Sequence, residues 1–337
     1  MFLHALSDHR IAHQMGIVIV AALALAATSA QAQQTSWKPE KKVEIIVGVA
    51  PGGAMDRTAR LAEELLEADK LIPGDSIVLN RAGGGHAVAL SYLAQKQGDP
   101  HYVQMVNTLL LTNNLMGRSQ IRHSDYTPIA TLFEEPMAFA VRAGSDIKDA
   151  KDLLARLKKD PGSLSFSVAS GIGTANHVAV IKLGKAAGVD IRKLKTVSFN
   201  SSSEGTTAVL GGHIDVTVTP PAPLMQFVEA KQLRFVAFAT EERVPGIFAD
   251  VPTWKELGVD ATVSAWRAVI APPNLKPEHI RFWEEAFGKM IRSDGFKAEA
   301  EKESLTAKYL NSAQTGAFLQ AQEDAYRDYL NDIGAKK

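Results

Sequence analysis

The residues that could do chemistry in this chain are small, polar and mostly neutral, and they gather in short loops. The first such loop contains Gly52, Gly53 and Ala54, between an apolar stretch at 43–49 and a stretch of helical spacing at 55–66. Backbone N–H groups in the first turn of a helix lack partners, and the helix dipole adds positive charge there. Because glycine has no Cβ, an anion can approach these donors closely. The loop therefore predicts anion binding, with a plain strand-to-helix connection as the alternative.

Several other kinds of site are excluded or disfavoured by the sequence. The glycines are not followed by Gly-Lys-Ser/Thr, and the G-x-G-x-x-G spacing is missing, so neither common nucleotide-binding loop is present. The chain contains no G-x-S-x-G elbow, no H-E-x-x-H motif and no cysteine. We therefore expect no enzyme activity, no cofactor and no metal site. A hydrolase whose residues come together only in space stays an alternative.

The arrangement of strand and polar loop occurs twice. Short strands are predicted in each half of the chain, at 43–49, 76–79 and 102–106, and then at 164–168, 195–199 and 214–218. Ligands of open parallel sheets bind beyond the carboxyl ends of the strands, so two such halves facing each other form one site. The predicted contacts are the backbones of Gly52, Gly53 and Ala54 and the side chains of Asn107, Thr108, Ser170, Thr174, Ser201 and Ser202.

Three charged or titratable residues near these loops have two interpretations each. Asp215 either forms a buried turn or receives a hydroxyl or amine of the ligand. Asp56 is expected to accept hydrogen bonds from backbone N–H groups at the start of its helix. His177, one turn into a helix, is expected to pack and hydrogen-bond rather than to do chemistry.

Two segments are expected to cross between the halves, at 137–141 and 263–270. They divide the chain into lobe 1, residues 36–139 plus 256–337, and lobe 2, residues 140–255. Arg267, in the second crossing segment, pairs either with a ligand carboxylate or with Glu134 or Glu135 of the first. Helices with apolar core faces are predicted at 277–292 and 314–333.

The N-terminus has the pattern of a secretory signal. Arg10 precedes an apolar run at 15–27, and Ala30-Gln31-Ala32 forms a small-x-small cleavage site. The run is short for a membrane span, so a signal peptide of residues 1–32 is favoured over an anchor. Lysine plus arginine equals aspartate plus glutamate, at 37 each, which gives no support to nucleic-acid binding.

Six segments, in order, carry a resemblance to a known family. The chain resembles the periplasmic solute receptors of tripartite tricarboxylate transporters, also called Bug receptors. The matching segments are Pro51-Gly52-Gly53 with Asp56, Asn80-Arg81 with Gly83-Gly84-Gly85, Ser170 to Thr174 with His177, Leu210 to Asp215, Asp250 to Thr253, and Trp266-Arg267 with Ala271-Pro272-Pro273.

The resemblance implies a fold, a function and partners. The fold is α/β, a two-lobed periplasmic-binding-protein (Venus-flytrap, type II-like) fold with two crossing strands and C-terminal helices. The implied function is capture of a small organic carboxylate, a di- or tricarboxylate or an aromatic acid, by a monomeric periplasmic receptor that delivers it to the membrane subunits of a transporter. A sensory role, in which the loaded protein docks on a signalling protein, is the alternative.

Two positions depart from the family pattern. Ala54 stands where members commonly have Ser or Thr, and Asn200 stands where many have Lys. The first change removes a hydroxyl from the ligand loop, and the second removes a possible charge partner of the ligand. Both bear on which carboxylate is bound.

Overall fold

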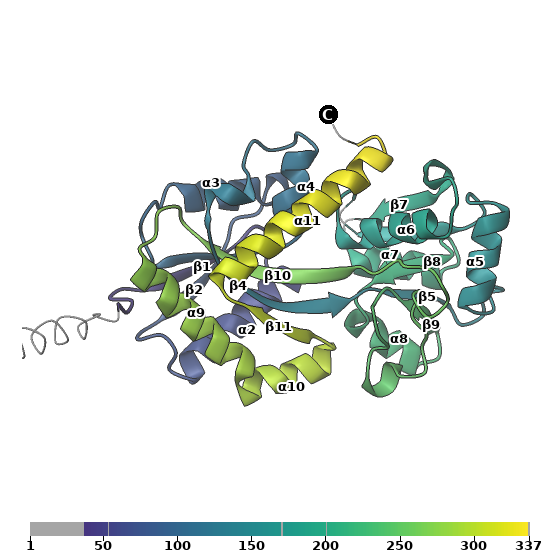
Figure 1. Cartoon of the computed structure of the whole chain (residues 1–337). Helices are drawn as coiled ribbons and strands as arrows, with labels where there is room; N and C mark the ends of the chain where they lie inside the picture. The colour runs from purple at the N-terminus through teal and green to yellow at the C-terminus, as the bar shows by residue number, and fades with distance from the viewer. Residues whose placement is uncertain (1–36, 53, 170, 200, 336–337) are drawn as a thin grey trace, which may run out of the picture. The chain divides into compact units, whose positions relative to one another are not determined.

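Two mixed β-sheets, each covered by helices, make up the described part of the chain (Figure 1). This computed structural model describes residues 37–52, 54–169, 171–199 and 201–335. The chain from Lys38 onward forms one compact unit. The predicted signal peptide, residues 1–32, lies outside the described residues and stays a prediction. Among the helices that are described, none is long and apolar enough to cross a membrane.

The first sheet has six strands in the order β11-β4-β10-β3-β1-β2. Strand β1 pairs in parallel with β2 on one side and β3 on the other, whereas β10 is antiparallel to β3 and β4, and β11 is antiparallel to β4. The strands are β1 (Val43–Val47), β2 (Ser76–Asn80), β3 (Tyr102–Val106), β4 (Thr127–Pro136), β10 (Ser264–Ala271) and β11 (Thr306–Leu310).

The second sheet has five strands in the order β7-β6-β8-β5-β9. Strand β6 pairs in parallel with β7 and β8, as β1 does with β2 and β3, and β5 is antiparallel to β8 and β9. The predicted repeat of strand and loop is therefore confirmed. The strands are β5 (Ala138–Arg142), β6 (Ser165–Ala169), β7 (Lys195–Phe199), β8 (Val216–Thr219) and β9 (Leu233–Phe238).

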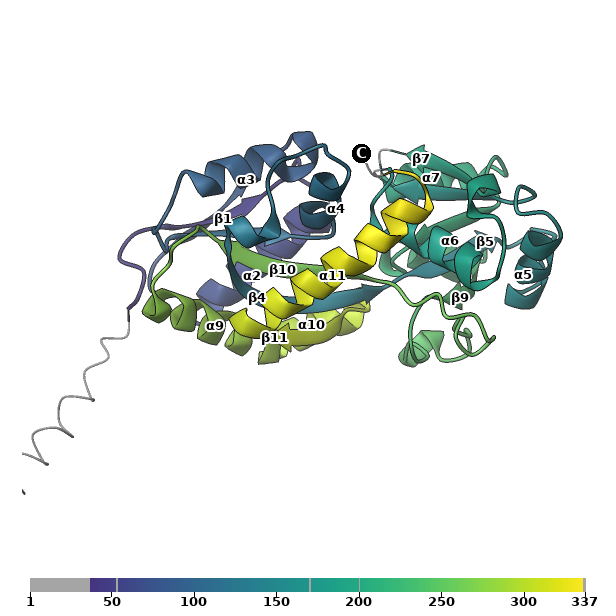
Figure 2. The same cartoon turned by 45° about the horizontal axis from the view of Figure 1, so that its top comes forward.

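Helices cover both faces of the first sheet because its strands are apolar on both faces. Ile46 belongs to one core cluster, whereas Ile45 and Val47 belong to another, as expected for side chains that alternate along a strand. Figures 1 and 2 show α3, α4 and α11 on one face and α2, α9 and α10 on the other. Their bounds are α2 (Ala54–Ala68), α3 (Ala87–Ala94), α4 (Leu109–Leu115), α9 (Pro277–Arg292), α10 (Asp294–Glu303) and α11 (Ser312–Asp332).

The second sheet is covered in the same way. Residues of α5 and α6 share the larger core cluster with Phe166 of β6, whereas Val209 of α7 packs in a smaller cluster with Ala140 of β5. The helices are α5 (Ala150–Lys159), α6 (Ala175–Ala186), α7 (Ser202–Leu210) and α8 (Met225–Glu229).

The chain passes from the first sheet to the second between β4 and β5, with Met137 alone between them, and returns between β9 and β10. The two predicted crossings are therefore present. The lobe boundaries at 139/140 and 255/256 stay predictions.

Most expected elements lie within a few residues of their predicted ranges, and the differences have local causes. The sequence predicts a helix at 206–210, but helix α7 begins at Ser202, because the side chain of Ser201 accepts a hydrogen bond from the N–H of Glu204 and caps the helix. Helices α4, α8 and α10 and strands β4 and β11 were not predicted. Helix α4 has seven residues, too few for apolar residues to show a clear helical period.

Candidate functional site

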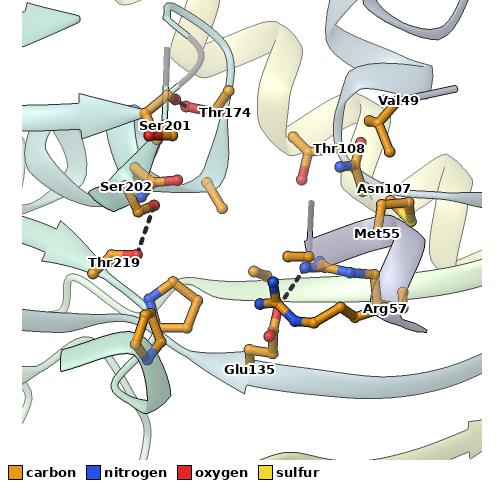
Figure 3. A pocket seen from close by; sticks show the side chains of 18 of the residues that line it. Val49, Met55, Arg57, Asn107, Thr108, Glu135, Thr174, Ser201, Ser202 and Thr219 are labelled. Atoms are coloured by element: carbon orange, nitrogen blue, oxygen red, sulfur yellow. Dashed lines mark hydrogen bonds and ion pairs between the residues drawn. The ribbon is translucent and has the colours of Figure 1, made fainter. Parts of the chain in front are cut away.

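A cavity of about 540 Å³ lies where the loops of the two sheets meet. Such a volume suits a small-molecule ligand. Figure 3 shows Thr174, Ser201, Ser202 and Thr219 on one side of it, opposite Asn107 and Thr108. The wall consists of Val49, Ala50, Pro51, Gly52, Ala54, Met55, Arg57, His86, Asn107, Thr108, Leu109, Glu135, Ala169, Thr174, Ala175, Asn176, Ser201, Ser202, Ser203, Thr219, Pro220, Ala222, Pro223, Ala265, Arg267 and Glu303.

The loop between β1 and α2 is held in place by Asp56. Its carboxylate accepts hydrogen bonds from the N–H of Gly52 at 2.8 Å, from Asn80 at 2.8 Å and from Arg60 at 3.0 Å. Burial by itself would raise the pKa of Asp56, but the hydrogen bonds from Gly52, Arg60 and Asn80 outweigh it and keep this pKa below its ordinary value. The predicted role of Asp56 is confirmed.

The bond to Asp56 changes what Gly52 can offer a ligand. Its N–H is already donated to the carboxylate, and its carbonyl accepts from Arg57 at 3.2 Å. Gly52 therefore lines the cavity without the unused donor that the sequence predicted. The left-handed backbone at Gly52 (φ 86°) is the conformation that glycine adopts without strain.

Asn107 and Thr108 end strand β3 and begin α4. The amide oxygen of Asn107 accepts from the N–H of Leu109 at 3.0 Å, which leaves its NH₂ group for the cavity. The hydroxyl of Thr108 lies 3.4 Å from that of Tyr326 on α11. Both side chains therefore present polar atoms from the first sheet.

The hydroxyls of the second sheet differ in what they leave for a ligand. The Oγ atoms of Ser201 and Ser202 act as acceptors, from the N–H of Glu204 at 3.2 Å and from Thr219 Oγ1 at 2.9 Å. Neither serine donates its own O–H to another described residue, so each can donate it to a ligand oxygen. Thr174 instead donates its O–H within its loop, to the carbonyls of Ala169 at 3.0 Å and Gly171 at 2.9 Å.

Counting Asp215, ten candidate contacts were predicted from the sequence. Seven of them line the cavity, and three have a different outcome. The seven are Gly52, Ala54, Asn107, Thr108, Thr174, Ser201 and Ser202. Gly53 and Ser170 lie outside the described residues. The structure does not bring Asp215 to the cavity wall. It precedes β8 at the end remote from Thr219, and its carboxylate accepts from the N–H and Oγ of Ser165 at 2.7 and 2.6 Å. These contacts join the segment before β8 to the first residue of β6, and Asp215 is exposed, so the structure shows neither a ligand contact nor a buried turn.

Four charged or titratable residues on the wall were not predicted as ligand contacts. His86 directly follows the glycine-rich turn 83–85, and Arg57 lies in helix α2. Glu135 was considered only as a partner of Arg267, and Glu303 belongs to helix α10, which was not predicted. The sequence feature that could have identified Arg57, His86 and Glu135 is their closeness to a strand end or to a predicted crossing. Glu303 has no such feature.

Arg267 adopts the second of its two alternatives, the ion pair with Glu135, and pairing with a ligand carboxylate stays a prediction. Its guanidinium forms an ion pair with Glu135 of β4, and both residues line the cavity. The paired strands β4 and β10 place Glu135 opposite Ala265, two residues before Arg267 and on the same face of the sheet.

His177 hydrogen-bonds with the hydroxyl of Tyr329 on α11, so the expected packing role is confirmed. Burial lowers the pKa of His177 to about 4. Burial also raises the pKa of Tyr329 above its ordinary value. Both groups are therefore neutral at pH 7, and they join helix α6 to helix α11.

Comparisons with known proteins agree with this fold. BugT of Bordetella pertussis is 24% identical, over 88% of this chain and 91% of its own length. A TctC solute-binding protein from Polaromonas is 25% identical, with a TM-score of 0.73, over 87% of this chain and 99% of that one.

A structure from Rhodopseudomonas palustris with adipate is 21% identical, with a TM-score of 0.76, over 88% of this chain and 98% of that one. These similarities confirm the predicted two-lobed fold of binding proteins. The model of the tripartite tricarboxylate transporter family receptor matches residues 59–334. The chain therefore belongs to the family of tripartite tricarboxylate transporter receptors.

Proposed function

We propose that this protein is a periplasmic receptor that captures a small organic carboxylate and delivers it to the membrane subunits of a tripartite tricarboxylate transporter. The single observation that carries the proposal is the cavity of about 540 Å³, to which the corresponding loops of two repeated sheets contribute neutral donors. The ligand is a di- or tricarboxylate or an aromatic acid, and the receptor acts as a monomer.

The donors suit a carboxylate. The O–H groups of Ser201 and Ser202 and the NH₂ of Asn107 face one another across the cavity (Figure 3). The first residues of α2, α6 and α7 also lie on its wall, so the positive ends of three helix dipoles add to the attraction. Hydrogen bonds to a charged group contribute about 1.5–3 kcal/mol each. A few such bonds, less the free energy of ordering and closure, give about micromolar affinity.

Two further observations support the same function. The related structure from Rhodopseudomonas palustris holds adipate, which is a dicarboxylate. The signal peptide predicted at 1–32 would export the protein and be removed, and the cavity would then lie in the compartment where such receptors meet their ligands.

A ligand screen tests the proposal. The mature chain, residues 33–337, is mixed with mono-, di- and tricarboxylates and aromatic acids, and its melting temperature is measured. A ligand that binds only the folded state at 100 times its Kd stabilises that state by about 2.7 kcal/mol, which is a readily measured shift. Titration calorimetry then gives the Kd. If no organic acid raises the melting temperature at millimolar concentration, the proposed ligand class is wrong.

Delivery to a transporter needs a separate measurement. Vesicles that contain the membrane subunits are expected to take up the radiolabelled ligand only when the loaded receptor is added. Uptake that is the same with and without the receptor, together with capture of a signalling protein by the loaded receptor, would favour the sensory alternative.

A further inference from the structure

His86 is an unusual residue on the cavity wall. Its side chain is buried, with 1% of its surface exposed, and neither ring nitrogen has a hydrogen-bond partner among the described residues. Its backbone has a φ of 80°, in the left-handed region that residues other than glycine seldom adopt. Buried polar groups are normally hydrogen-bonded, and strained backbone positions cluster at ligand sites. Both features at one cavity residue point to a ligand as the missing partner.

The surrounding glycines make room for this histidine. Gly83, Gly84 and Gly85 all have positive φ values and turn the chain between β2 and α3. A Cβ on Gly48, just after β1, would lie 2.7 Å from the Cβ of His86, so glycine there lets the two segments approach. The backbone therefore holds the imidazole at the cavity in spite of its unfavourable conformation.

Arg267 and Glu135 lie on the same wall. The side chain of Arg267 is 8% exposed and that of Glu135 is 15% exposed. One guanidinium nitrogen of Arg267 pairs with Glu135 and another donates to the carbonyl of Trp266 at 3.2 Å, but its Nε has no partner among the described residues. The pair thus has zero net charge and one unused N–H donor.

Burial and the nearby Arg267 set the charge state of His86. Burial is the larger cause and the positive charge of Arg267 the smaller, and together they lower the pKa of His86 to about 4. At pH 7 the imidazole is therefore neutral and offers one N–H donor and one N acceptor. Together, His86 and Arg267 present unused donors and an acceptor with no net charge once Glu135 is included.

This combination suits a hydroxyl group better than a second carboxylate. A carboxylate placed against the neutral Arg267–Glu135 pair would add an uncompensated negative charge to a buried region, which is costly. A hydroxyl accepts from the Nε of Arg267 and donates to the acceptor nitrogen of His86 without changing the charge. We propose that His86, Arg267 and Glu135 form a subsite for a hydroxyl group of the ligand, so that the receptor is selective for hydroxycarboxylates. This inference rests on the proposed function, since the carboxylate itself binds at the loops.

Matched ligands test the subsite on the unmodified protein. The Kd of the mature chain is measured for pairs of acids that differ by one hydroxyl: succinate and malate, glutarate and 2-hydroxyglutarate, tricarballylate and citrate. At least one hydroxy acid is expected to bind at least about tenfold more tightly than its partner, because the acid without the hydroxyl leaves buried polar groups unpaired. For a chiral ligand, one enantiomer is expected to bind more tightly, because the subsite fixes the direction of the hydroxyl.

A variant assigns the preference to His86. His86→Phe keeps a ring of similar shape but has no ring nitrogens. In this variant the Kd of the unsubstituted acid divided by that of the hydroxy acid is expected to fall at least about fivefold, mainly because the hydroxy acid binds more weakly. His213→Phe is the control, because His213 is exposed and does not line the cavity. The melting temperature of each variant shows whether the variant is folded. If His86→Phe does not fold, the matched ligands still test the hydroxyl subsite on the unmodified chain.

The outcomes separate this inference from the proposed function. If unsubstituted and hydroxylated acids bind the unmodified chain equally well, the subsite is wrong and the receptor function stands. If a hydroxyl preference exists but persists in folded His86→Phe, the assignment to His86 is wrong. If no carboxylate binds at all, the proposed function fails and the subsite fails with it.

Discussion

The hydroxyl side chains of this cavity have different roles, and their hydrogen bonds show which hydroxyls are able to donate to a ligand. Ser201 and Ser202 accept bonds from the protein and keep a proton for the ligand, whereas Thr174 donates its proton within its own loop. Gly52 lies in the first loop, but its N–H already donates to the carboxylate of Asp56. The residues able to donate to a ligand are thus fewer than the polar residues on the wall.

Ala54 offers a direct test of the first loop. Ala54→Asp places a carboxylate on the cavity wall at the first residue of α2. The carboxylate repels an anionic ligand, but its interaction with the positive end of the helix dipole stabilises α2. We expect carboxylate affinity to fall by at least about tenfold, or about 1.4 kcal/mol, without a loss of melting temperature. Calorimetry and thermal melts measure both quantities.

Ala54→Ser is the matched control for this change. It adds a hydroxyl donor in place of a negative charge, so it should bind the same ligand with equal or higher affinity. If the affinity of Ala54→Asp matches that of Ala54→Ser, the first loop does not contact the carboxylate.

At the scale of elements, helix α7 links stability to ligand binding. It begins on the cavity wall, and the side chain of Ser201 both caps it and is available to the ligand. Helix α5 is capped in the same way, by Asp149 accepting from the N–H of Asp152 at 2.9 Å, but it contributes no residue to the wall. Asp149 is therefore a matched control for Ser201, since both cap a helix but only Ser201 lines the cavity.

Removing each cap should separate these effects. Ser201→Ala and Asp149→Ala are each expected to lower the free energy of unfolding by about 1 kcal/mol, the usual contribution of an N-cap. Only Ser201→Ala should also weaken ligand binding, because it removes a donor from the cavity. Urea unfolding and calorimetry give the two numbers, and an unchanged Kd in Ser201→Ala would remove this hydroxyl from the site.

For the whole molecule, helix α11 connects parts that the two sheets carry separately. It packs on β4 of the first sheet, and its C-terminal end reaches the helices of the second sheet (Figure 2). There Tyr329 hydrogen-bonds with His177 of α6, and Asp332 pairs with Lys185. A ligand that contacts loops of both sheets is expected to favour the conformation in which they are closest. Small-angle scattering should show a smaller radius of gyration of the mature chain with ligand than without it, and no change would argue against closure.

The buried histidines predict a loss of stability in mild acid. Burial, joined by the positive charge of Arg267 in the case of His86, lowers the pKa of His86 and His177 from the ordinary 6.5 to about 4. Between these values the unfolded chain takes up protons that the folded chain does not, so stability falls as the pH falls. The loss at pH 5 relative to pH 7.5 is on the order of 2 kcal/mol for each histidine.

His177→Gln tests that expectation, because glutamine does not titrate. The variant is less stable at pH 7.5 if the bond to Tyr329 matters, but its free energy of unfolding should change less between pH 7.5 and 5 than that of the unmodified chain. Urea unfolding at both pH values measures this. Equal pH dependence in the two proteins would show that His177 is not buried in its neutral form.

The sequence by itself determined the repeated order of strand, polar loop and helix, and most of the small polar residues on the cavity wall. Strands buried on both faces are apolar runs, and the loops after them are marked by glycine, serine and asparagine, so both signals are local. Loop positions such as Asn107 and Ser202 could be predicted because the carboxyl ends of parallel strands share one edge of a sheet.

The tertiary structure alone decided which of these groups are available and which distant residues join them. Three features depend on strand pairing and chain crossing: the use of the Gly52 N–H by Asp56, the bonds from Ser165 to Asp215, and the position of His86 on the same cavity wall as Arg267 and Glu135. Hydrogen-bond partners and burial are properties of segments far apart in the chain, so no local pattern of residues specifies them.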